Sequence, residues 1–489
     1  MIDNILLGIE VAFNYQNFLY LVVGVLLGTL VGILPGLGPA SSISILLPAT
    51  FYLGPVTGMI FLAGLYYGSQ YGGSTTAILL NTPGENSAIM TCIDGNKMAK
   101  AGRAGPAIMA AALSSFIAGI IMAVVMAVVA PPLAEIAFKF GPAEYTLIML
   151  FGFISVILLT GTDLLTGLSL AFLGMMFGLI GTDINSGIDR FTFNIPELMD
   201  GINFSCVAMG LFAVSEIFKS LINSKNITSY TSNVELYPNK EDVKRVIPAA
   251  LRGTLVGGFL GLLPGGGITI SSYVGYAVEK KLSKNKQEIG NGAIEGVAAP
   301  EAANNASAQA GLIPLLSLGL PENAVMALLL GSMLVAGIVP GPMVLTQHPD
   351  LFWGLVISML IGNSILLFLN YPLVRVWIQI LKVPYNLLYP SILAICFLGT
   401  YAINYNPNDV MILAGFVVLG YIFLILDLSP ITFILGFVLG PMFEDNFRRS
   451  LSISQGDISI FYKTDIGIGL IIMIGLFLVL GIYKSIKVK

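Results

Sequence analysis

The sequence of 489 residues has little charge, few cysteines and almost no histidine. Only 10% of its residues are charged and 56% are hydrophobic, whereas soluble domains carry about 25% charged residues. The mean hydropathy is +0.88. A water-soluble core needs far less apolar sequence, so this composition indicates a protein that lies in the bilayer. The net charge of −4 comes without any basic block, so nothing points to a nucleic-acid partner.

The scarcity of cysteine and histidine excludes several chemistries. Cys92, Cys206 and Cys396 are widely spaced and form no CxxC pair, so they predict neither a disulfide framework nor a metal site. His348 is the one histidine that could activate a serine nucleophile, and we expect it in an extracytoplasmic loop. A zinc-protease HExxH motif is absent. We therefore expect no enzyme, no catalytic residue and no cofactor.

Long apolar runs predict an all-α polytopic membrane protein, because a spanning helix needs roughly 20 apolar residues. Such runs lie near 18–35, 106–131, 143–160, 164–181, 203–222, 351–370, 386–404, 408–427 and 466–485, with a shorter one near 428–443. Two regions rich in Gly, Pro, Ser, Thr and Asn, 36–92 and 264–345, do not resolve into clean spans. We expect roughly 11–13 spans in all. Residues 1–17 lack the basic segment of a signal peptide, so the first run is predicted to be a retained helix.

Two motifs occur twice in the same order. The pattern G-x3-G-x-L-P-G-x-G fits Gly28 to Gly38 and again Gly257 to Gly267. The stretch "LNTPGENSA" at 80–88 is matched by "LGLPENA" at 318–324. We interpret these as two repeats, a first half at 1–224 and a second half at 248–489, joined by a polar cytoplasmic linker at 225–247. A chance likeness between Gly/Pro-rich helices is the alternative.

Lysine and arginine predict that the two repeats are inverted, because short cytoplasmic loops carry an excess of these residues. No basic residue precedes the first motif and several precede the second, so the copies should enter from opposite faces. The basic residues of Lys97–Arg103 and Lys280–Lys286 place both segments inside. The N-terminus is then outside, and the C-terminus, with Lys484, Lys487 and Lys489, is cytoplasmic. Inverted repeats with broken helices and re-entrant hairpins are typical of secondary transporters of the cell membrane.

The broken segments are the predicted substrate site. Proline lacks a backbone donor and glycine allows close approach, so these breaks free amide and carbonyl groups inside the membrane. Helix N-termini attract anions, and unwound carbonyls can hold Na⁺. A packing kink without a ligand is the alternative. The predicted substrate-binding residues are Pro35, Gly36, Gly38, Ser41, Asn81, Thr82, Pro83, Gly265, Gly267, Asn304, Asn305, Ser307 and Pro321.

Polar residues of the run 292–323 extend this hypothesis. Amides such as Asn304 and Asn305 can meet carboxylate oxygens or a cation, although they also serve as ordinary contacts between membrane helices. Glu295 and Glu301 are the candidates for ion coupling, because acids inside a membrane are costly and usually functional. They could instead lie at the interface beside the Lys280–Lys286 loop. The residues at which a bound Na⁺ is conceivable are Gly36, Asn81, Gly265 and Asn305.

From about Val23 to Ser459 the chain resembles the large membrane subunit of tripartite tricarboxylate transporters, the TctA family. The resemblance rests on the blocks "GILPGLGP", "YGGSTTAILLNTPGENSAIMTCIDGNKMAKAGRAGPA", "LLPGGG", "EGVAAPEAANNASAQAGLIPLLSLGLP" and "GPMFEDNFRRSLSISQGD". It implies import of a small carboxylate such as citrate, driven by Na⁺ or H⁺. It also implies two partners, a small four-helix membrane subunit and an extracytoplasmic solute-binding protein.

The two loop tips depart from the family pattern, in which a small residue such as Ser, Thr or Pro usually follows the proline and glycine. Here the tips carry Glu85–Asn86 and Glu322–Asn323. Two carboxylates would repel a trianionic solute unless they were protonated or paired with cations. The expected membrane core has no lysine or arginine, so co-bound cations would help to neutralise a carboxylate, which favours symport. The alternative to a transporter is a channel or a membrane scaffold without transport activity.

Overall fold

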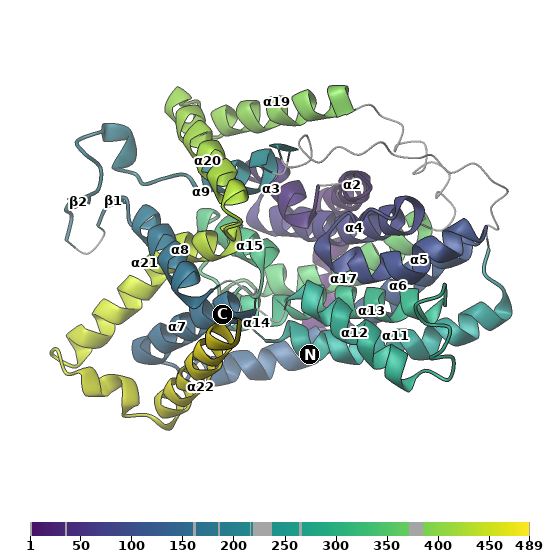
Figure 1. The fold of residues 1–489 in the computed structure, drawn as a ribbon. Helices are drawn as coiled ribbons and strands as arrows, with labels where there is room; N and C mark the ends of the chain where they lie inside the picture. The colour runs from purple at the N-terminus through teal and green to yellow at the C-terminus, as the bar shows by residue number, and fades with distance from the viewer. Residues whose placement is uncertain are drawn as a thin grey trace.

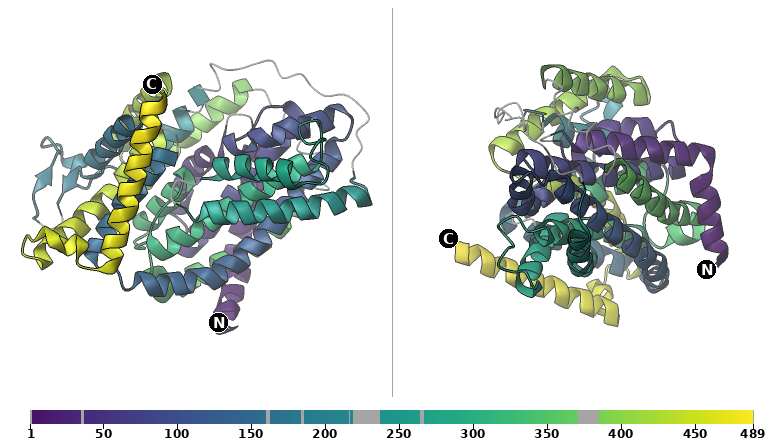
Figure 2. Two further views of the ribbon diagram at one scale, coloured as in Figure 1. Left: turned by 60° about the horizontal axis from the view of Figure 1, so that its bottom comes forward. Right: turned by 90° about the vertical axis from the view of Figure 1, so that its right-hand side faces the viewer.

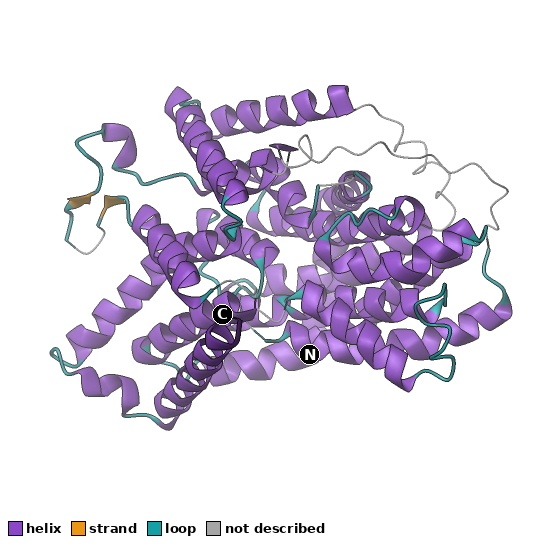
Figure 3. Ribbon diagram, viewed as in Figure 1, coloured by secondary structure: helices purple, strands orange, loops and turns teal. Residues whose placement is uncertain are grey.

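The computed structural model describes residues 2–34, 37–159, 163–183, 186–215, 217–218, 237–263, 267–370 and 385–488. Within these residues nearly all regular structure is helical, with one pair of two-residue strands (Figure 3). The strands β1 (Gly181–Thr182) and β2 (Asp189–Arg190) pair antiparallel and project from the helical body (Figure 1). The views of Figure 2 separate the N-terminal helix from the C-terminal helix, which runs along the outside of the molecule.

The helices fall into two sets, before and after the gap in the described chain at 219–236. The first set is α1 (Ile2–Phe13), α2 (Tyr15–Gly32), α3 (Pro39–Thr50), α4 (Pro55–Leu80), η1 (Asn86–Ala88), α5 (Ile89–Lys100), α6 (Ala104–Ala137), α7 (Pro142–Leu159), α8 (Leu164–Gly178), η2 (Pro196–Leu198), α9 (Phe204–Ala208) and the π-helical turn η3 (Met209–Val214). The second set is α11 (Lys240–Gly261), α12 (Ile268–Leu282), α13 (Glu295–Ala310), α14 (Leu312–Leu318), α15 (Ala324–Val335), α16 (Met343–Gln347), α17 (Pro349–Asn370), α19 (Tyr385–Asn404), α20 (Pro407–Ile425), α21 (Pro430–Ile453), η4 (Ile458–Tyr462) and α22 (Asp465–Val488).

Apolar helices confirm the predicted all-α polytopic membrane fold. By length and composition α2, α6, α17 and α20 can each cross a membrane, and shorter apolar helices include α7, α8, α15, α19 and α22. The predicted runs from 18–35 to 466–485 fall on such helices or on α9 and η3. The run expected to be short, 428–443, belongs to α21, which has 24 residues because it continues through a polar second half. The number of spans remains a prediction.

The polar second half of α21 is held to the strand pair by charge. Arg190 of β2 pairs with Glu444 at 2.8 Å, and Arg448 pairs with Asp183 at 2.9 Å. These contacts join residues that are far apart in the sequence at one end of the molecule (Figure 1). They explain why a helix whose apolar stretch is short extends beyond that stretch.

The two regions that did not resolve into spans form the centre of the molecule. α4 is buried from Thr57 to Leu79, and α13 is buried along its whole length of 16 residues. α4 packs against α2, α3, α6 and α17, while α13 packs against α6, α11 and α12. Their many small and polar residues lower the hydropathy of both helices. Hydropathy therefore failed to mark them, although they are among the most enclosed helices of the described chain.

Two seams of glycine hold these central helices in place. α2 presents three glycines at a spacing of four residues to α4, and α11 presents three to α13 in the same manner. The pairs are Gly24–Phe61, Gly28–Leu65 and Gly32–Ser69 in the first seam, and Gly253–Ala299, Gly257–Ala303 and Gly261–Ser307 in the second. A Cβ at any of these glycines would overlap main-chain atoms of its partner. Such close backbone approach is the packing expected of small residues between membrane helices.

Basic segments that were predicted to share one side of the membrane lie together. Lys97 Nζ donates a hydrogen bond to Gly290 O at 2.5 Å, in the loop after α12. Arg103, at the start of α6, pairs with Asp242 of α11 at 2.7 Å. These contacts join the end of α5 to α11 and to the Lys280–Lys286 region. They support a common side for the three segments, and the assignment of that side to the cytoplasm remains a prediction.

The predicted linker at 225–247 is described only at its end, because residues 219–236 lie outside the described residues. α11 begins at Lys240, so the last part of the linker is helical. Asn239 caps this helix: its side chain accepts the Asp242 N–H at 2.8 Å, and Asp242 accepts the Asn239 N–H at 3.0 Å. This reciprocal pair satisfies two backbone donors at the helix start. The division into halves at 1–224 and 248–489 stays a prediction.

Candidate functional site

Buried amides of α13 mark the candidate site. Asn304 and Asn305 are at most 1% exposed. Asn304 Nδ2 donates to Glu85 Oε1 at 2.9 Å, and Asn305 Nδ2 donates to Ser115 Oγ of α6 at 2.7 Å. The Oδ1 atoms of both amides are buried and have no hydrogen-bond partner among the described residues. Each amide therefore uses its donor within the protein and keeps an acceptor for something else.

Glu301 lies one turn before these amides and connects α13 to the first set of helices. Its Oε2 accepts a hydrogen bond from Ser74 Oγ of α4 at 2.6 Å, and its Oε1 accepts one from the Thr91 hydroxyl of α5. Glu301 is 1% exposed. Hydroxyl groups solvate this carboxylate, and no basic side chain of the described chain donates to it. A negative charge here is uncompensated, which makes Glu301 responsive to a cation or a proton.

The two loop tips bring two more carboxylates toward the same region. Glu85 follows the end of α4 and is 9% exposed, and Glu322 follows α14 and is 1% exposed. Glu85 contacts Asn304, while Glu322 Oε1 accepts from Asn323 Nδ2 at 2.9 Å. The Oε2 atom of each is buried without a hydrogen-bond partner in the described part of the chain. The Tyr66 hydroxyl of α4 lies close enough to both carboxylates to interact with them electrostatically.

More buried polar atoms without described partners surround this cluster. They include the Tyr67 hydroxyl and the Gln70 amide of α4, and Ser307 Oγ and Gln309 Oε1 of α13. Gln309 Nε2 donates to Asn363 Oδ1 of α17 at 3.4 Å. Leaving a buried polar group unsatisfied costs about 1–3 kcal/mol. Native proteins contain few such groups, so their presence between α4 and α13 makes this region the candidate site.

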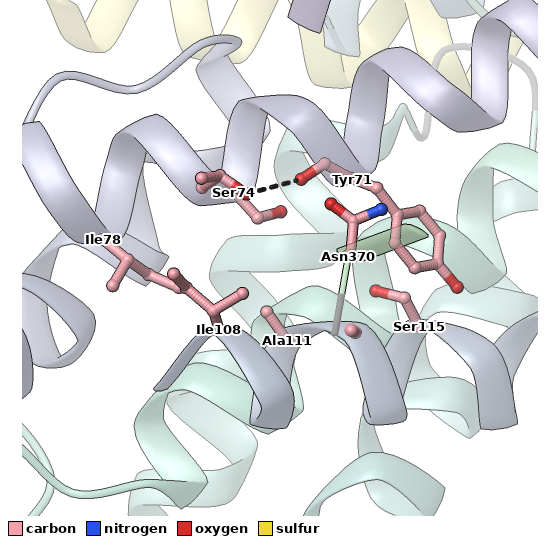
Figure 4. Close-up of a pocket in the computed structure, with 9 residues that line it drawn as sticks. Tyr71, Ser74, Ile78, Ile108, Ala111, Ser115 and Asn370 are labelled. Carbon is pink, nitrogen blue, oxygen red and sulfur yellow. Dashed lines mark hydrogen bonds between the residues drawn. The ribbon is translucent and has the colours of Figure 1, made fainter. Parts of the chain in front are cut away.

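A small pocket lies between α4, α6 and the end of α17 (Figure 4). It is lined by Tyr71, Ser74, Thr75 and Ile78 of α4, by Ile108, Ala111, Ala112 and Ser115 of α6, and by Asn370 at the end of α17. Figure 4 shows Tyr71, Ser115 and Asn370 grouped on one side of it. Two of the residues that line it are hydrogen-bonded to the polar cluster. Ser74 donates to Glu301, and Ser115 accepts from Asn305. The pocket therefore borders the polar cluster directly.

The first break lies against the first loop tip. A Cβ at Gly38 would lie 4.0 Å from Gly84 O, and a Cβ at Gly84 would lie 2.8 Å from Gly32 O. The end of α2, the start of α3 and the tip next to Glu85 are therefore neighbours. The predicted residues Pro35 and Gly36 lie outside the described residues.

The second break is described only at its edges, because Pro264 and Gly265 lie outside the described residues. Gly261, just before it, packs on the main chain of Ser307. Gly267, just after it, precedes α12 with a φ of 52°, which favours glycine. The helix α11, which ends at the second break, therefore packs on the polar helix α13. In the same way α2, which ends at the first break, packs on α4.

Other predicted site residues lie outside the polar cluster. Asn81 and Thr82 are exposed at the end of α4, where Asn81 adopts a φ of 54° as the helix cap. The Ser41 hydroxyl donates to a main-chain oxygen of η3 at 3.1 Å and so fixes α3. Pro83 is half-buried and Pro321 is buried, each at its loop tip. The structure therefore places the two tip carboxylates, Glu85 and Glu322, in the polar cluster. Asn81 and Thr82 lie outside it.

Glu295 has surroundings unlike those of Glu301. Arg245 donates to both of its carboxylate oxygens at 2.7 Å, and Asn285 Nδ2 donates to Oε1 at 2.8 Å. Glu295 begins α13 next to the Lys280–Lys286 loop. The sequence left open an alternative position beside this loop, and the structure places Glu295 there, with Arg245 as its partner. Its charge is already compensated, so the geometry does not support ion coupling by Glu295.

Several residues of the cluster were not singled out from the sequence. Tyr66 and Tyr71 lie in a segment of small residues, where repeated tyrosines were the available signal. Ser115 and Asn363 lie inside the long apolar helices α6 and α17, and a lone polar residue in such a helix is a hint of a buried partner. Within the described ranges, no three His, Cys, Asp or Glu side chains are grouped so as to hold a metal ion.

Comparisons with known proteins bear on the whole chain. The family model described as "Tripartite tricarboxylate transporter TctA family" matches residues 18–435. An uncharacterised 52.8 kDa protein in the TAR-I ttuC′ 3′ region of Agrobacterium vitis is 46% identical over 492 residues, which cover 100% of this chain and 98% of that protein. An uncharacterised protein in the TAR-II ttuC′ 3′ region of the same organism is 46% identical over 233 residues, 48% of this chain and 96% of that protein. No solved structure matches. Because the family model spans most of the chain, and because the fold is that of a polytopic membrane protein, this chain belongs to the tripartite tricarboxylate transporter TctA family.

Proposed function

We propose that this chain is the transport subunit of an ion-coupled secondary transporter that imports a small carboxylate, such as a citrate-like tricarboxylate. It works in the cell membrane with an extracytoplasmic solute-binding protein and a small four-helix membrane subunit. Membership in the TctA family supports both the transport function and the tripartite assembly. The coupling ion is Na⁺ or H⁺, and no other cofactor is needed.

The observation that carries this proposal is the cluster of buried polar atoms between α4 and α13. Asn304 and Asn305 offer amide oxygens without described partners in the centre of an apolar bundle. Gln70 offers both atoms of its amide and Ser307 its hydroxyl, also without described partners. Amides can donate to carboxylate oxygens and can also coordinate cations through their own oxygen. A solute and its ion can therefore be held by groups that the folded chain leaves unused.

Charge supports coupling to a cation. Glu85, Glu301 and Glu322 contribute carboxylates to the cluster, and no lysine or arginine of the described chain donates to them. Two like charges about 4 Å apart repel by about 4 kcal/mol at an effective dielectric constant of about 20. An anionic solute can approach this cluster only if protons or metal cations enter with it. Symport follows from that requirement, whereas exchange of one anion for another does not remove the repulsion.

The proposal includes two inverted halves, at 1–224 and 248–489, with the N-terminus outside and the C-terminus cytoplasmic. The two glycine seams support the relation between the halves, because each joins the helix before a break to a central helix in the same way. Related halves that face each other across a central site suit alternating access. A channel would not need the second, inverted copy in the same chain.

Uptake of labelled carboxylates into cells that express this chain with its two partners tests the proposal. We expect saturable uptake that requires the solute-binding protein and a Na⁺ or proton gradient. A library of mono-, di- and tricarboxylates would identify the solute class. Flux that rises linearly with solute and persists without the binding protein would favour a channel instead. Absence of carboxylate uptake with all three components in the membrane would contradict the proposed function.

A further inference from the structure

We propose that Glu85 and Glu322 are the carboxylate ligands of two equivalent binding sites for a monovalent metal cation of sodium size, one at each loop tip. The inference rests on the proposed function for its role in transport. The binding itself is a property of this chain and can be measured without any solute. The two residues are those at which the loop tips carry acids in place of small side chains.

The glycine seams define which residues of the two central helices correspond. In the seams Leu65 occupies the place of Ala303, and Ser69 occupies the place of Ser307. Continued in the same register, the corresponding pairs are Tyr66 and Asn304, Gly73 and Gly311, and Asn81 and Gly319. The last pair provides a check, because both residues cap their helices in the left-handed region, with φ of 54° and 73°. The correspondence therefore reaches to the prolines of the loop tips, Pro83 and Pro321. The second tip lacks the glycine that follows Pro83, so Glu322 follows its proline directly, whereas Glu85 comes one residue later.

Both tip carboxylates are seated on the corresponding glycine of their own half. A Cβ at Gly73 would lie 3.5 Å from Glu85 Cγ. A Cβ at Gly311 would overlap the Glu322 side chain. The glycines thus leave room for the carboxylates against the central helices, so that each tip turns its acid inward. An acid that merely replaced a small loop residue would have no reason to be buried at both places.

The tip carboxylates lie near Asn304 and Tyr66, the corresponding residues of the two central helices. Glu85 accepts a hydrogen bond from Asn304 of α13, and the Tyr66 hydroxyl of α4 lies near both Glu85 and Glu322. The site at Glu85 is therefore assembled from the tip of one half and the central helix of the other. Cation binding at Glu85 would hold the two halves together.

The atoms left free at these sites suit a hard monovalent cation. Glu85 Oε2 and Glu322 Oε2 are buried without described partners, and Asn304 Oδ1 lies on the residue that already touches Glu85. Hard cations take oxygen ligands, and Na⁺ in transporters is held by a few oxygens at helix ends and unwound segments. The tips directly follow the C-terminal ends of α4 and α14, where the helix dipole favours positive charge.

Glu301 is not part of this pair. In the register of the glycine seams, the residue of α4 that corresponds to Glu301 is Ala63. Glu301 therefore has no acidic counterpart in the first half. Its two oxygens already accept hydrogen bonds from two hydroxyls. The pair at the tips, in contrast, has two members with one unpartnered oxygen each. The structure thus points to two bound cations per chain.

Thermal unfolding of the purified full chain, without solute, tests the sites. The protein is heated in NaCl, KCl or choline chloride at equal ionic strength and pH. We expect NaCl to raise the midpoint of the wild type in a concentration-dependent manner, because an ion that binds only the folded state stabilises it. Glu85→Gln and Glu322→Gln should each remove about half of the sodium-specific shift, and the double variant should remove all of it.

Glu144→Gln is the matched control. Glu144 is also a buried carboxylate, but its oxygens accept from the Thr464 hydroxyl at 2.6 Å and the Gly141 N–H at 2.8 Å, in α7 and away from both tips. This variant should keep the full sodium-specific shift. Equal midpoints of the wild type in NaCl and choline chloride would overturn the proposal. A full sodium-specific shift in the double variant would overturn it as well.

Binding of radioactive ²²Na⁺ at low temperature covers variants that are too unstable for the melting experiment. We expect about two sodium ions per wild-type chain, about one in each single variant and none in the double variant. Unchanged binding in both single variants would contradict the assignment of Glu85 and Glu322. Intact sodium binding without carboxylate uptake would contradict the proposed function alone. Gradient-driven uptake by a chain that binds no sodium would contradict this inference alone.

Discussion

Asn304 and Asn305 are adjacent in the sequence and yet serve different neighbours. Consecutive residues of an α-helix point about 100° apart. Asn304 therefore reaches the loop tip at Glu85, and Asn305 reaches Ser115 of α6. At the scale of single residues, this pair is where the two sets of helices and the pocket wall meet. It is the first place at which the site should be tested.

Alanine at position 304 or 305 distinguishes a ligand from a packing contact. A lost contact between membrane helices costs about 0.6 kcal/mol of stability, and uptake should then remain normal at matched expression. As ligands, the amides contribute to affinity, which falls about tenfold for each 1.4 kcal/mol lost. We expect KM for the solute, or the ion concentration for half-maximal uptake, to rise at least about tenfold.

The control for these variants is Asn446→Ala, whose amide bonds the Met442 carbonyl within α21, outside the cluster. Uptake by this control should match that of the wild type. Wild-type kinetics in both Asn304→Ala and Asn305→Ala, with normal membrane levels, would remove the two amides from the site.

Glu301→Gln should change the response to ions more than the affinity for solute. Glutamine keeps the shape of the side chain and an oxygen that can accept from Ser74 or Thr91, but it carries no charge. We expect the dependence of uptake on Na⁺ or pH to shift, while KM for the solute at saturating ion changes less. The measurement is uptake over a matrix of ion and solute concentrations. An unaltered ion dependence would show that the charge of Glu301 is not used.

The sequence could predict the types of residue in the site but not all of their partners. Asn304, Asn305, Ser307 and Glu301 stood out because polar groups are costly in an apolar bundle, and the structure buries all of them. Glu295 stood out for the same reason. What separates it from Glu301 is Arg245, which comes from another helix. Partners that are distant in the sequence are a property of the fold, which composition and spacing do not reveal.

At the scale of helices, the glycine seams are the feature that positions the site. Each seam brings a helix that leads into a break against a central polar helix without side chains between them. Lipid tails are as apolar as most side chains, so close packing of small residues replaces hydrophobic burial as the source of helix association. Adding a single methyl group in a seam should therefore lower the stability of the protein.

Gly257→Ala tests the second seam. The new Cβ would overlap the main chain of Ala303, so α11 and α13 must separate locally. Overpacking of this kind costs about 1–3 kcal/mol. We expect a lower midpoint of thermal unfolding and reduced uptake. Gly415→Ala in α20 is the matched control, because no described atom beyond the neighbouring backbone of its own helix lies within 4 Å of the position of its Cβ.

In the control the exchange should leave the midpoint unchanged or raise it slightly, since alanine favours a helix more than glycine does. If Gly257→Ala were as stable as Gly415→Ala, the close approach of α11 and α13 would be wrong. A loss of stability in both variants would point to the glycine content of membrane helices in general and not to the seam.

The sequence predicted those helices that hydropathy alone can identify. The apolar helices α2, α6, α17 and α20 match the predicted runs, because each is long and uniformly apolar. α4 and α13 could not be identified in this way, because their glycines, hydroxyls and amides face other helices and not lipid. The duplicated motifs were the better signal there. They pointed to the two regions that turn out to contain the central helices.

At the scale of the whole molecule, the orientation in the membrane is the prediction most open to test. Single cysteines are introduced in a background that lacks the three native cysteines, at Lys100, Lys284 and Asp350. Lys100 and Lys284 are exposed in the structure, in the basic region that should face the cytoplasm. An impermeant thiol reagent added to intact cells should therefore label position 350 and spare positions 100 and 284. Labelling of position 284 from outside would contradict the inverted arrangement of the two halves.

The central claim is that a gradient of ions drives a carboxylate through this chain. The most direct measurement reconstitutes the chain with its small membrane subunit in sealed vesicles, adds the solute-binding protein outside, and imposes a Na⁺ or proton gradient. We expect the labelled solute to accumulate inside above its external concentration and to leak back when the gradient is collapsed. Entry that stops at equal concentrations on both sides, with or without a gradient, would contradict the account.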